Sequence, residues 1–150
     1  MKLSQLLERM NYTCIQGSVD IPISHLLYDS RNACPDGVFV CISGAVMDGH
    51  SFIQDVVMKG VTAVIVEKDV KAPAHVTVIR VENTRSALAY MSAAYFGYPA
   101  EELKTIGITG TKGKTTTTYM VRSILENSGF KTGLIGTIET IIGKKVIKAN

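Results

Sequence analysis

Helical spacing of apolar residues, together with residues typical of helix ends, predicts four helices. Gly60 and the Ser128-Gly129 pair end two of them, and Asn83 or Thr84 can cap the helix that runs to Gly97. The predicted helices cover residues 3–10, 52–60, 83–97 and 114–127, with Leu3, Leu6, Leu7 and Met10 forming one face of the first and Leu88, Met91, Ala94 and Tyr95 forming one face of the third.

Short apolar and β-branched runs lie between these helices and predict strands. The turn residues Asp29-Ser30-Arg31-Asn32 and Pro35-Asp36-Gly37 separate the first two strands, and Gly143-Lys144 closes a predicted hairpin. Strands alternating with helices favour an α/β fold built on a sheet. The predicted strands cover residues 23–28, 38–42, 62–66, 75–81, 104–109 and 132–137, of which 104–109 is expected to be buried.

A domain boundary is predicted at Tyr98-Pro99-Ala100, because proline cannot continue the preceding helix and biases Tyr98 toward an extended conformation. Residues 1–98 then form a small α/β domain, and residues 99–150 form the first part of a second domain. Fifty-two residues are too few to close a parallel sheet that is covered on both faces, so we expect the second domain to be incomplete.

Composition excludes two classes of protein. Apolar residues make up 46% of the 150 residues and charged residues 19%, which excludes a disordered chain. The longest uncharged stretch, 86–100, has 15 residues and is shorter than the roughly 20 that a membrane span requires. Charges at Lys2, Glu8 and Arg9 exclude a secretion signal. The cytoplasm is therefore the expected location.

Sulfur-containing side chains are expected to lie in the interior. Three cysteines without metal-ligand spacing are expected to be buried thiols in a reducing compartment, and three methionines are candidates for the core. These residues are Cys14, Cys34 and Cys41, and Met47, Met58 and Met91.

Positive charge gathers in the last third of the chain. Residues 1–98 carry eight basic and nine acidic side chains, whereas residues 99–150 carry eight basic and four acidic ones, within a total net charge of +3. Lys144, Lys145 and Lys148 are expected to face water, and no aromatic residues lie between them, which disfavours nucleic-acid binding. Lys112 and Lys114 instead suggest a small anionic ligand.

The strongest chemical signal is a phosphate loop at 107–116, because a Gly-Lys-Thr sequence follows an apolar strand and opens a helix. Glycines and a helix N-terminus direct amide groups at an anion, Lys114 supplies a point charge to the β- and γ-phosphates, and Thr115 supplies an oxygen to Mg²⁺. Ile108 stands where the usual longer loop has its first glycine, so a glycine-rich turn without a ligand is the alternative. The expected ATP-binding residues are Gly110, Thr111, Lys112, Gly113, Lys114, Thr115 and Thr116, with Lys114 and Thr115 catalytic.

Two motifs together carry a resemblance to a known family. The first runs from Thr109 to Thr117, and the second comprises Asp29-Ser30-Arg31, 35–40, Gly44 and Asp48-Gly49-His50. The pair resembles the Mur ligases of peptidoglycan synthesis over essentially the whole chain. Within that family the chain looks most like the MurE type, which adds a diamino acid.

The resemblance implies a reaction, its substrates and its cofactors. Such enzymes use ATP and Mg²⁺ to phosphorylate the D-Glu carboxylate of UDP-MurNAc-L-Ala-D-Glu, and the amine of a diamino acid (meso-diaminopimelate or L-lysine) then attacks the acyl phosphate. Phosphoryl transfer of this kind depends on positioning and charge neutralisation. A monomer without membrane insertion, working in cell-wall biogenesis and cell division, is also implied.

The resemblance implies substrate-binding residues as well. Ser30 would hydrogen-bond the uridine diphosphate part with Tyr28 beside it, whereas Arg31 is expected to pair with Asp29 or a neighbouring loop and His50 to cap or pack. Lys112 departs from the asparagine usual in the family. The remaining implied substrate residues are Ala45, Val46 and Met47 at the uracil, and Asn150 at the muramoyl-peptide part.

Two alternatives remain open. The MurF type, which adds D-Ala-D-Ala, has a similar first domain, and a UDP-sugar or nucleotide-binding module without turnover also fits. Kinases and GTPases are disfavoured, because their folds usually begin near the phosphate loop. Since the family's remaining catalytic groups would lie beyond Asn150, we expect the 150-residue chain to have no ligase activity by itself.

Overall fold

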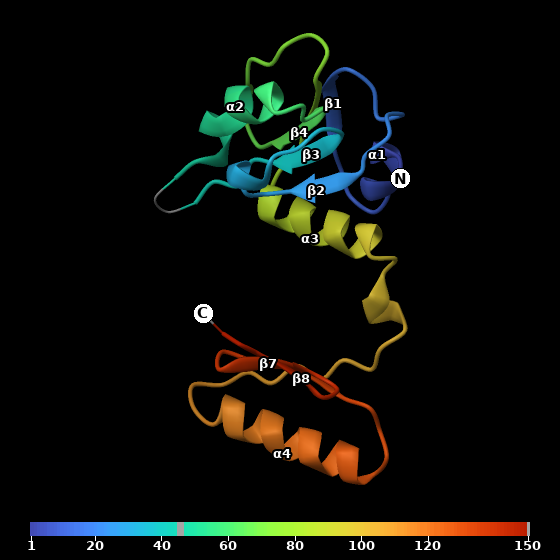
Figure 1. The fold of residues 1–150 in the computed structure, drawn as a ribbon, viewed down its shortest axis with the longest axis vertical. Helices are drawn as coiled ribbons and strands as arrows, with labels where there is room; N and C mark the ends of the chain where they lie inside the picture. Colours follow the sequence, from blue (N-terminus) through green and yellow to red (C-terminus); the bar gives the residue numbers. More distant parts are fainter. Residues whose placement is uncertain (45–46, 150) are drawn as a thin grey trace. The chain divides into compact units, whose positions relative to one another are not determined.

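The protein divides into two compact units, Met1–Leu103 and Lys104–Asn150. A computed structural model describes residues 1–44 and 47–149 (Figure 1). Each unit has its own sheet, with five strands in the first and three in the second. The mixed α/β fold class is therefore confirmed.

The first unit is built on a mainly parallel sheet with the strand order β1-β5-β4-β3-β2. Strands β2 to β5 pair in parallel, and β1 adds an antiparallel edge to β5. Connections between parallel strands need a crossover, which α2 supplies between β3 and β4. The strands are β1 (Thr13–Gln16), β2 (His25–Leu27), β3 (Gly37–Val40), β4 (Ala63–Val66) and β5 (Thr77–Arg80).

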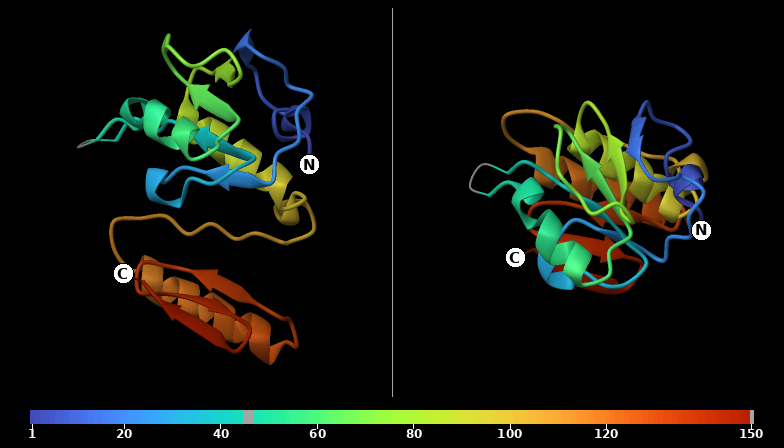
Figure 2. Two further views of the ribbon diagram at one scale, coloured as in Figure 1. Left: turned by 45° about the horizontal axis from the view of Figure 1, so that its top comes forward. Right: turned by 90° about the horizontal axis from the view of Figure 1, so that it is seen from above.

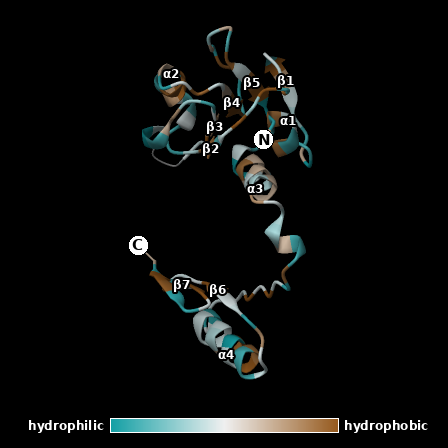
Figure 3. Cartoon of the chain, turned by 45° about the vertical axis from the view of Figure 1, so that its right-hand side comes forward, coloured by the Kyte–Doolittle hydropathy of each residue, from teal (hydrophilic) through white to brown (hydrophobic). Residues whose placement is uncertain are grey.

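Helices cover both faces of this sheet, α1 (Leu3–Leu6) and α3 (Thr84–Tyr95) on one and α2 (Ile53–Met58) on the other (Figure 2). Alternate side chains of one strand point to opposite faces. Val38 and Val40 therefore pack with α1 and α3, whereas Phe39 packs with α2. Strands that are buried on both faces explain the continuous apolar runs in the sequence, which also appear as the hydrophobic colour of the strands in Figure 3.

The second unit consists of one helix and an antiparallel sheet of order β6-β7-β8. Leu134 and Ile141 pair across β6 and β7, and both are buried. Gly143 adopts a positive φ of 57° in the predicted hairpin turn. The elements are α4 (Lys114–Asn127), β6 (Gly133–Ile135), β7 (Glu139–Ile142) and β8 (Lys145–Lys148), so the predicted helix 114–127 and the hairpin are confirmed.

The buried strand predicted at 104–109 is wrong. These residues form no strand, and all except the half-buried Ile108 are exposed. A strand needs a neighbour that satisfies its backbone groups. The described strands of the second unit pair only with one another, as an antiparallel sheet. Helix α1 (Leu3–Leu6) is also shorter than the predicted helix 3–10, and strand β1 was not predicted.

Tyr98 is not extended, contrary to the expectation from the proline that follows it. It adopts a left-handed conformation with φ 54° and ψ 52°, and its amide donates to Ala93 O at 2.7 Å. Contacts from the other end of the first unit hold it there: the Arg9 guanidinium lies 3.7 Å from the centre of the Tyr98 ring and also pairs with Glu101. Helix capping and tertiary packing therefore outweigh the local preference.

Not every sulfur-containing residue lies in the interior. Met91 and Cys41 are buried, but Met47 and Met58 are 61% and 79% exposed, Cys14 is exposed and Cys34 is half-buried. Met58 lies at the end of α2 and Cys14 on the edge strand β1, where one side faces solvent. Periodicity does not distinguish these positions from core positions.

The cysteines are expected to differ in reactivity. Burial raises the pKa of the Cys41 thiol to about 12, whereas Cys14 is exposed. Because the thiolate is the nucleophile, iodoacetamide at pH 8 is expected to alkylate Cys14 readily and Cys41 only after unfolding. Peptide mass spectrometry of native and denatured samples measures this, and equal labelling of the two cysteines in the native protein would contradict the burial of Cys41.

Candidate functional site

The first candidate site is the edge of the large sheet at which the parallel strands end. Tyr28 and Ser30 follow β2, Ser43 and Gly44 follow β3, and Glu67 follows β4. Since β2, β3 and β4 pair in parallel with matched registers, these residues lie along one edge. Crevices at the carboxyl ends of parallel strands are the usual ligand sites of open α/β sheets.

The Asp29-Ser30-Arg31 segment begins a short 3₁₀ helix, η1 (Ser30–Asn32). The Asp29 carboxylate accepts from the Arg31 amide at 3.0 Å and from its guanidinium at 2.6 Å, which lowers the pKa of Asp29 to about 2. Lys59 Nζ donates to Ser30 O at 2.7 Å. The predicted Asp29–Arg31 pair is thus confirmed, and the Ser30 hydroxyl has no hydrogen bond within the described part of the chain.

A tight turn follows β3. Gly44 N donates to Met47 O at 2.8 Å, and a Cβ on Gly44 would lie 2.8 Å from that oxygen, so the turn requires glycine there. Met47 and Tyr28 are 61% and 65% exposed, as side chains available to a ligand would be. Three residues predicted to bind substrate, Ala45, Val46 and Asn150, lie outside the described residues.

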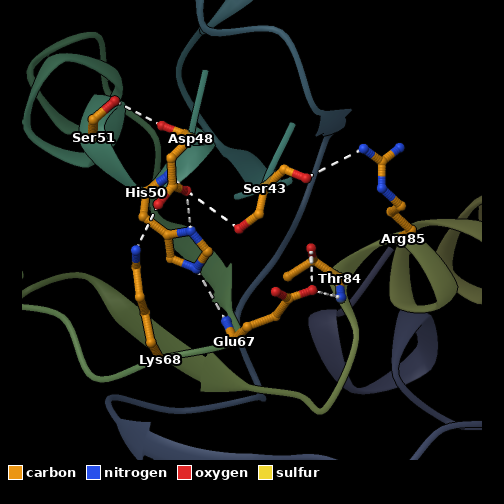
Figure 4. Close-up of polar contacts among 8 residues, drawn as sticks. All are labelled: Ser43, Asp48, His50, Ser51, Glu67, Lys68, Thr84 and Arg85. Atoms are coloured by element: carbon orange, nitrogen blue, oxygen red, sulfur yellow. Dashed lines mark hydrogen bonds and ion pairs between the residues drawn. The ribbon is translucent and has the colours of Figure 1, made fainter. Parts of the chain in front are cut away.

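His50 lies behind this turn and is buried. Its Nδ1 is 2.6 Å from Asp48 Oδ1, and its Nε2 accepts from the Glu67 amide at 3.1 Å (Figure 4). The packing role expected for His50 is confirmed. Sequence analysis missed Glu67 and Thr84, which belong to the same hydrogen-bonded group, because no local spacing connects them with His50.

The second candidate site is the loop that precedes α4. Gly113 forms the N-cap of α4 with a φ of 77°, and Gly110 has a φ of 148°; both are conformations that favour glycine. The Lys114 ammonium donates to Gly110 O at 2.6 Å, so its charge lies over the loop. Free amides at the start of a helix of 14 residues and an adjacent cation suit an anion.

Comparison with known proteins establishes the family. Residues 22–96 match the model described as "Mur ligase family, catalytic domain", and residues 108–150 match "Mur ligase middle domain". The chain belongs to the Mur ligase family. The two matches fall on the two candidate sites, one on the edge of the large sheet and one on the loop before α4.

The similar proteins are ligases of this family. The UDP-N-acetylmuramoyl-L-alanyl-D-glutamate--2,6-diaminopimelate ligase of Clostridium perfringens is 47% identical over 149 residues, which cover 99% of this chain and 31% of the relative. A solved structure of a ligase with that name matches with a TM-score of 0.74 over 98% of the chain and 30% of the structure, but is 18% identical and so supports the fold alone. MurF from Thermotoga maritima in complex with ADP is 28% identical, covering 69% of the chain and 23% of that structure, with a TM-score of 0.50.

This Mur ligase chain also has a cavity of about 190 Å³ in its second unit. Lys114, Thr115, Tyr119 and Glu139 contribute to its lining. The Tyr119 hydroxyl donates to the Glu139 carboxylate, which raises the pKa of Tyr119. Sequence analysis missed both residues; the one available signal was helical spacing, which places Tyr119 four positions after Thr115 on the same side of α4.

Two kinds of feature are absent from the described ranges. Residues 1–44 and 47–149 contain no cluster of three or more His, Cys, Asp or Glu side chains arranged to hold a metal. Within the same ranges, no helix combines the length and hydrophobicity that a membrane crossing requires.

Proposed function

We propose that this chain supplies the UDP-binding unit and the phosphate loop of a MurE-type ligase, which joins a diamino acid to UDP-MurNAc-L-Ala-D-Glu at the expense of ATP. The observation that carries the proposal is the 47% identity to the Clostridium perfringens ligase over 99% of the chain. The chain spans about 31% of that relative's length, so the reaction belongs to the whole ligase.

The loop before α4 suits the triphosphate of ATP. Backbone amides at Gly113 and the start of α4 would hold phosphate oxygens, and Lys114 would add a positive charge. Thr115 offers a hydroxyl oxygen, the ligand type that Mg²⁺ prefers. Gly110, Thr111, Lys112 and Thr116 complete the proposed loop, whose residues are exposed or half-buried and therefore accessible.

The edge of the large sheet suits the uridine diphosphate part of the substrate. The Ser30 hydroxyl is available as a donor, and the exposed Tyr28 and Met47 offer apolar surface for a base. Ala45 and Val46 belong to the same proposed site, and Asn150 is proposed to meet the muramoyl-peptide part. Residues 1–98 would thus hold the uridine diphosphate end, and the loop before α4 would hold ATP.

The chemistry requires activation because a carboxylate is a poor electrophile. ATP, when bound, supplies the γ-phosphoryl group that a carboxylate oxygen accepts as ADP leaves. The amine then attacks the carbonyl carbon, loses a proton and displaces inorganic phosphate as the amide bond forms. The contribution of Lys114 is to hold and neutralise phosphate charge, which is the main demand of phosphoryl transfer. We also propose that the whole enzyme is monomeric and cytoplasmic and works in cell-wall synthesis.

The MurF type is the alternative, favoured by the 28% identity to the ADP-bound MurF structure. The two types differ in the nucleotide substrate, which carries a dipeptide in the first case and a tripeptide in the second. Calorimetric titration of the 150-residue chain with both nucleotides distinguishes them. Tighter binding of UDP-MurNAc-L-Ala-D-Glu supports the MurE type, and tighter binding of the tripeptide nucleotide supports MurF.

Ser30→Ala tests the site itself. Because one hydrogen bond contributes about 1 kcal/mol, we expect the affinity for UDP-MurNAc-L-Ala-D-Glu to fall about fivefold. Ser123→Ala, an exposed serine on α4, is the matched control and is expected to bind normally. Absence of binding by the unaltered chain would refute the proposed function.

With ATP, Mg²⁺ and a diamino acid added, we expect the 150-residue chain to bind the UDP-linked substrate without releasing phosphate.

A further inference from the structure

A group of hydrogen bonds connects the turn after β3 with the ends of two other elements of the first unit (Figure 4). Asp48 Oδ1 is 2.6 Å from His50 Nδ1, and the Glu67 amide donates to His50 Nε2 at 3.1 Å. The Glu67 carboxylate then accepts from Thr84 N at 2.6 Å and from Thr84 Oγ1 at 2.8 Å. The connection thus runs from the turn, through the end of β4, to the first residue of α3.

The partners of His50 define its protonation. A backbone amide can only donate, so Nε2 must be the unprotonated acceptor that faces Glu67. The ring proton of the neutral imidazole is then on Nδ1 and is donated to the Asp48 carboxylate. The His50 side chain is 4% exposed, so water does not replace either bond. Each ring nitrogen therefore makes one hydrogen bond, Nδ1 with Asp48 and Nε2 with Glu67.

We name the described residues Ser43, Gly44, Met47 and Asp48 the edge turn. The Asp48 end is held by His50 and by Lys68 Nζ, which lies 2.5 Å from Asp48 Oδ2. The Ser43 end is held by the Arg85 guanidinium, which donates to Ser43 O at 3.2 Å from α3. A buried ring holds its position better than these exposed lysine and arginine side chains, since long exposed side chains retain rotational freedom.

The described ends of the edge turn also contact each other, because Ser43 Oγ donates to Asp48 Oδ1 at 3.4 Å. The turn is closed by the Gly44–Met47 hydrogen bond, and Met47 projects into solvent. A binding group on a loop reaches the precision required for recognition only when neighbouring residues lock it. The connection through His50 reaches the ends of β4 and α3, which are anchored in the core at Val66 and Ala87.

We propose that His50 is a positioning residue of the substrate site, which fixes the edge turn against Glu67 and Thr84 and thereby sets the affinity for the uridine diphosphate end of the substrate. The inference rests on the proposed function of that edge. His50 itself is buried and touches no substrate. It acts through Asp48 and the turn.

The test compares variants of the 150-residue chain in binding UDP. His50→Asn keeps a donor for Asp48 but loses the acceptor for Glu67, and His50→Gln offers an acceptor in place of Nε2. Each removes one of the two hydrogen bonds made by the His50 ring, and we expect each to weaken UDP binding five- to tenfold while circular dichroism still reports a folded chain. Ser51→Ala is the matched control, because it removes a hydrogen bond to Asp48 O at 2.7 Å without altering the connection to β4. We expect it to bind UDP normally.

A measurement on the unaltered chain keeps the proposal falsifiable if both histidine variants unfold. Long-range proton–nitrogen NMR spectra should show His50 Nε2 unprotonated and Nδ1 protonated, and UDP should shift the amide signals of Gly44 and Glu67 together. A protonated Nε2, an unshifted Glu67 amide, or a folded His50→Asn variant with normal affinity would overturn the proposal. If Ser30→Ala weakens binding and the His50 variants do not, only this inference fails; if the unaltered chain does not bind UDP, the proposed function fails with it.

Discussion

Lys114→Ala is expected to lower the affinity of the chain for ATP by at least about tenfold, which corresponds to about 1.4 kcal/mol. Lys114 is the first residue of α4, and its ammonium lies 2.6 Å from Gly110 O, above the backbone amides proposed to hold phosphate. Removing it takes away both the hydrogen bond to Gly110 O and the charge that offsets the triphosphate. Fluorescence titration with a labelled ATP analogue measures the change.

The neighbouring lysine provides the control for this prediction. Lys112 is exposed in the same loop but precedes the helix, so Lys112→Ala should weaken ATP binding much less and in a manner that salt suppresses. Lys114→Arg keeps the charge but not the compact ammonium, and we expect it to restore binding in part. Unchanged ATP binding by Lys114→Ala would indicate a glycine-rich turn without a phosphate ligand.

Phe39→Ala is expected to lower the free energy of unfolding of the first unit by about 3–5 kcal/mol, the largest stability effect that we predict. Phe39 is 1% exposed, stands in the middle of the sheet between Leu27 and Val64, and packs with the α2 face of the core. Its loss removes apolar contacts and leaves a cavity. Since small domains have only about 5–15 kcal/mol of stability, this loss would be a large share of the stability of the first unit.

Urea denaturation followed by circular dichroism measures this difference. Met58→Ala is the control, because Met58 is apolar and lies next to the same face of the sheet at the end of α2 but is 79% exposed. We expect it to change stability by less than about 0.5 kcal/mol. UDP binding should fall with the folded fraction in Phe39→Ala. An effect of similar size in the two variants would contradict the assignment of Phe39 to the core.

Elements with strong local signals were predictable from the sequence. The helix 114–127 is bounded by glycine and by Ser128-Gly129, and Asn83 does cap α3 by accepting from Ser86 N at 2.8 Å. Elements that depend on distant partners were not predictable. Residues 104–109 have a composition typical of a strand, but they have no strand beside them to pair with in the described part of the chain. Strand β1 lacks a regular hydrophobic pattern and is mostly exposed, yet it pairs with β5.

The same contrast applies to the candidate sites. The proposed phosphate loop and the observed Asp29–Arg31 pair each lie within contiguous residues, so the sequence alone could suggest both of them. The connection through His50 joins residues 17 positions apart twice, from His50 to Glu67 and from Glu67 to Thr84. Such spacing reflects the length of a crossover between parallel strands and carries no local signal, so only the folded sheet brings these side chains together.

The contacts of Arg9 with Tyr98 and Glu101 have a mechanical consequence. They connect Arg9, three residues beyond the end of α1, with the segment through which the chain leaves the first unit, η3 (Pro99–Glu101). We therefore expect tension applied at Leu103 to act first on the contacts of Arg9 with Tyr98 and Glu101, and on α1, before it reaches the hydrogen bonds between the parallel strands. Under such tension we expect these exit contacts to break before the edge that carries Ser30 and the edge turn, at the ends of β2 and β3, changes shape.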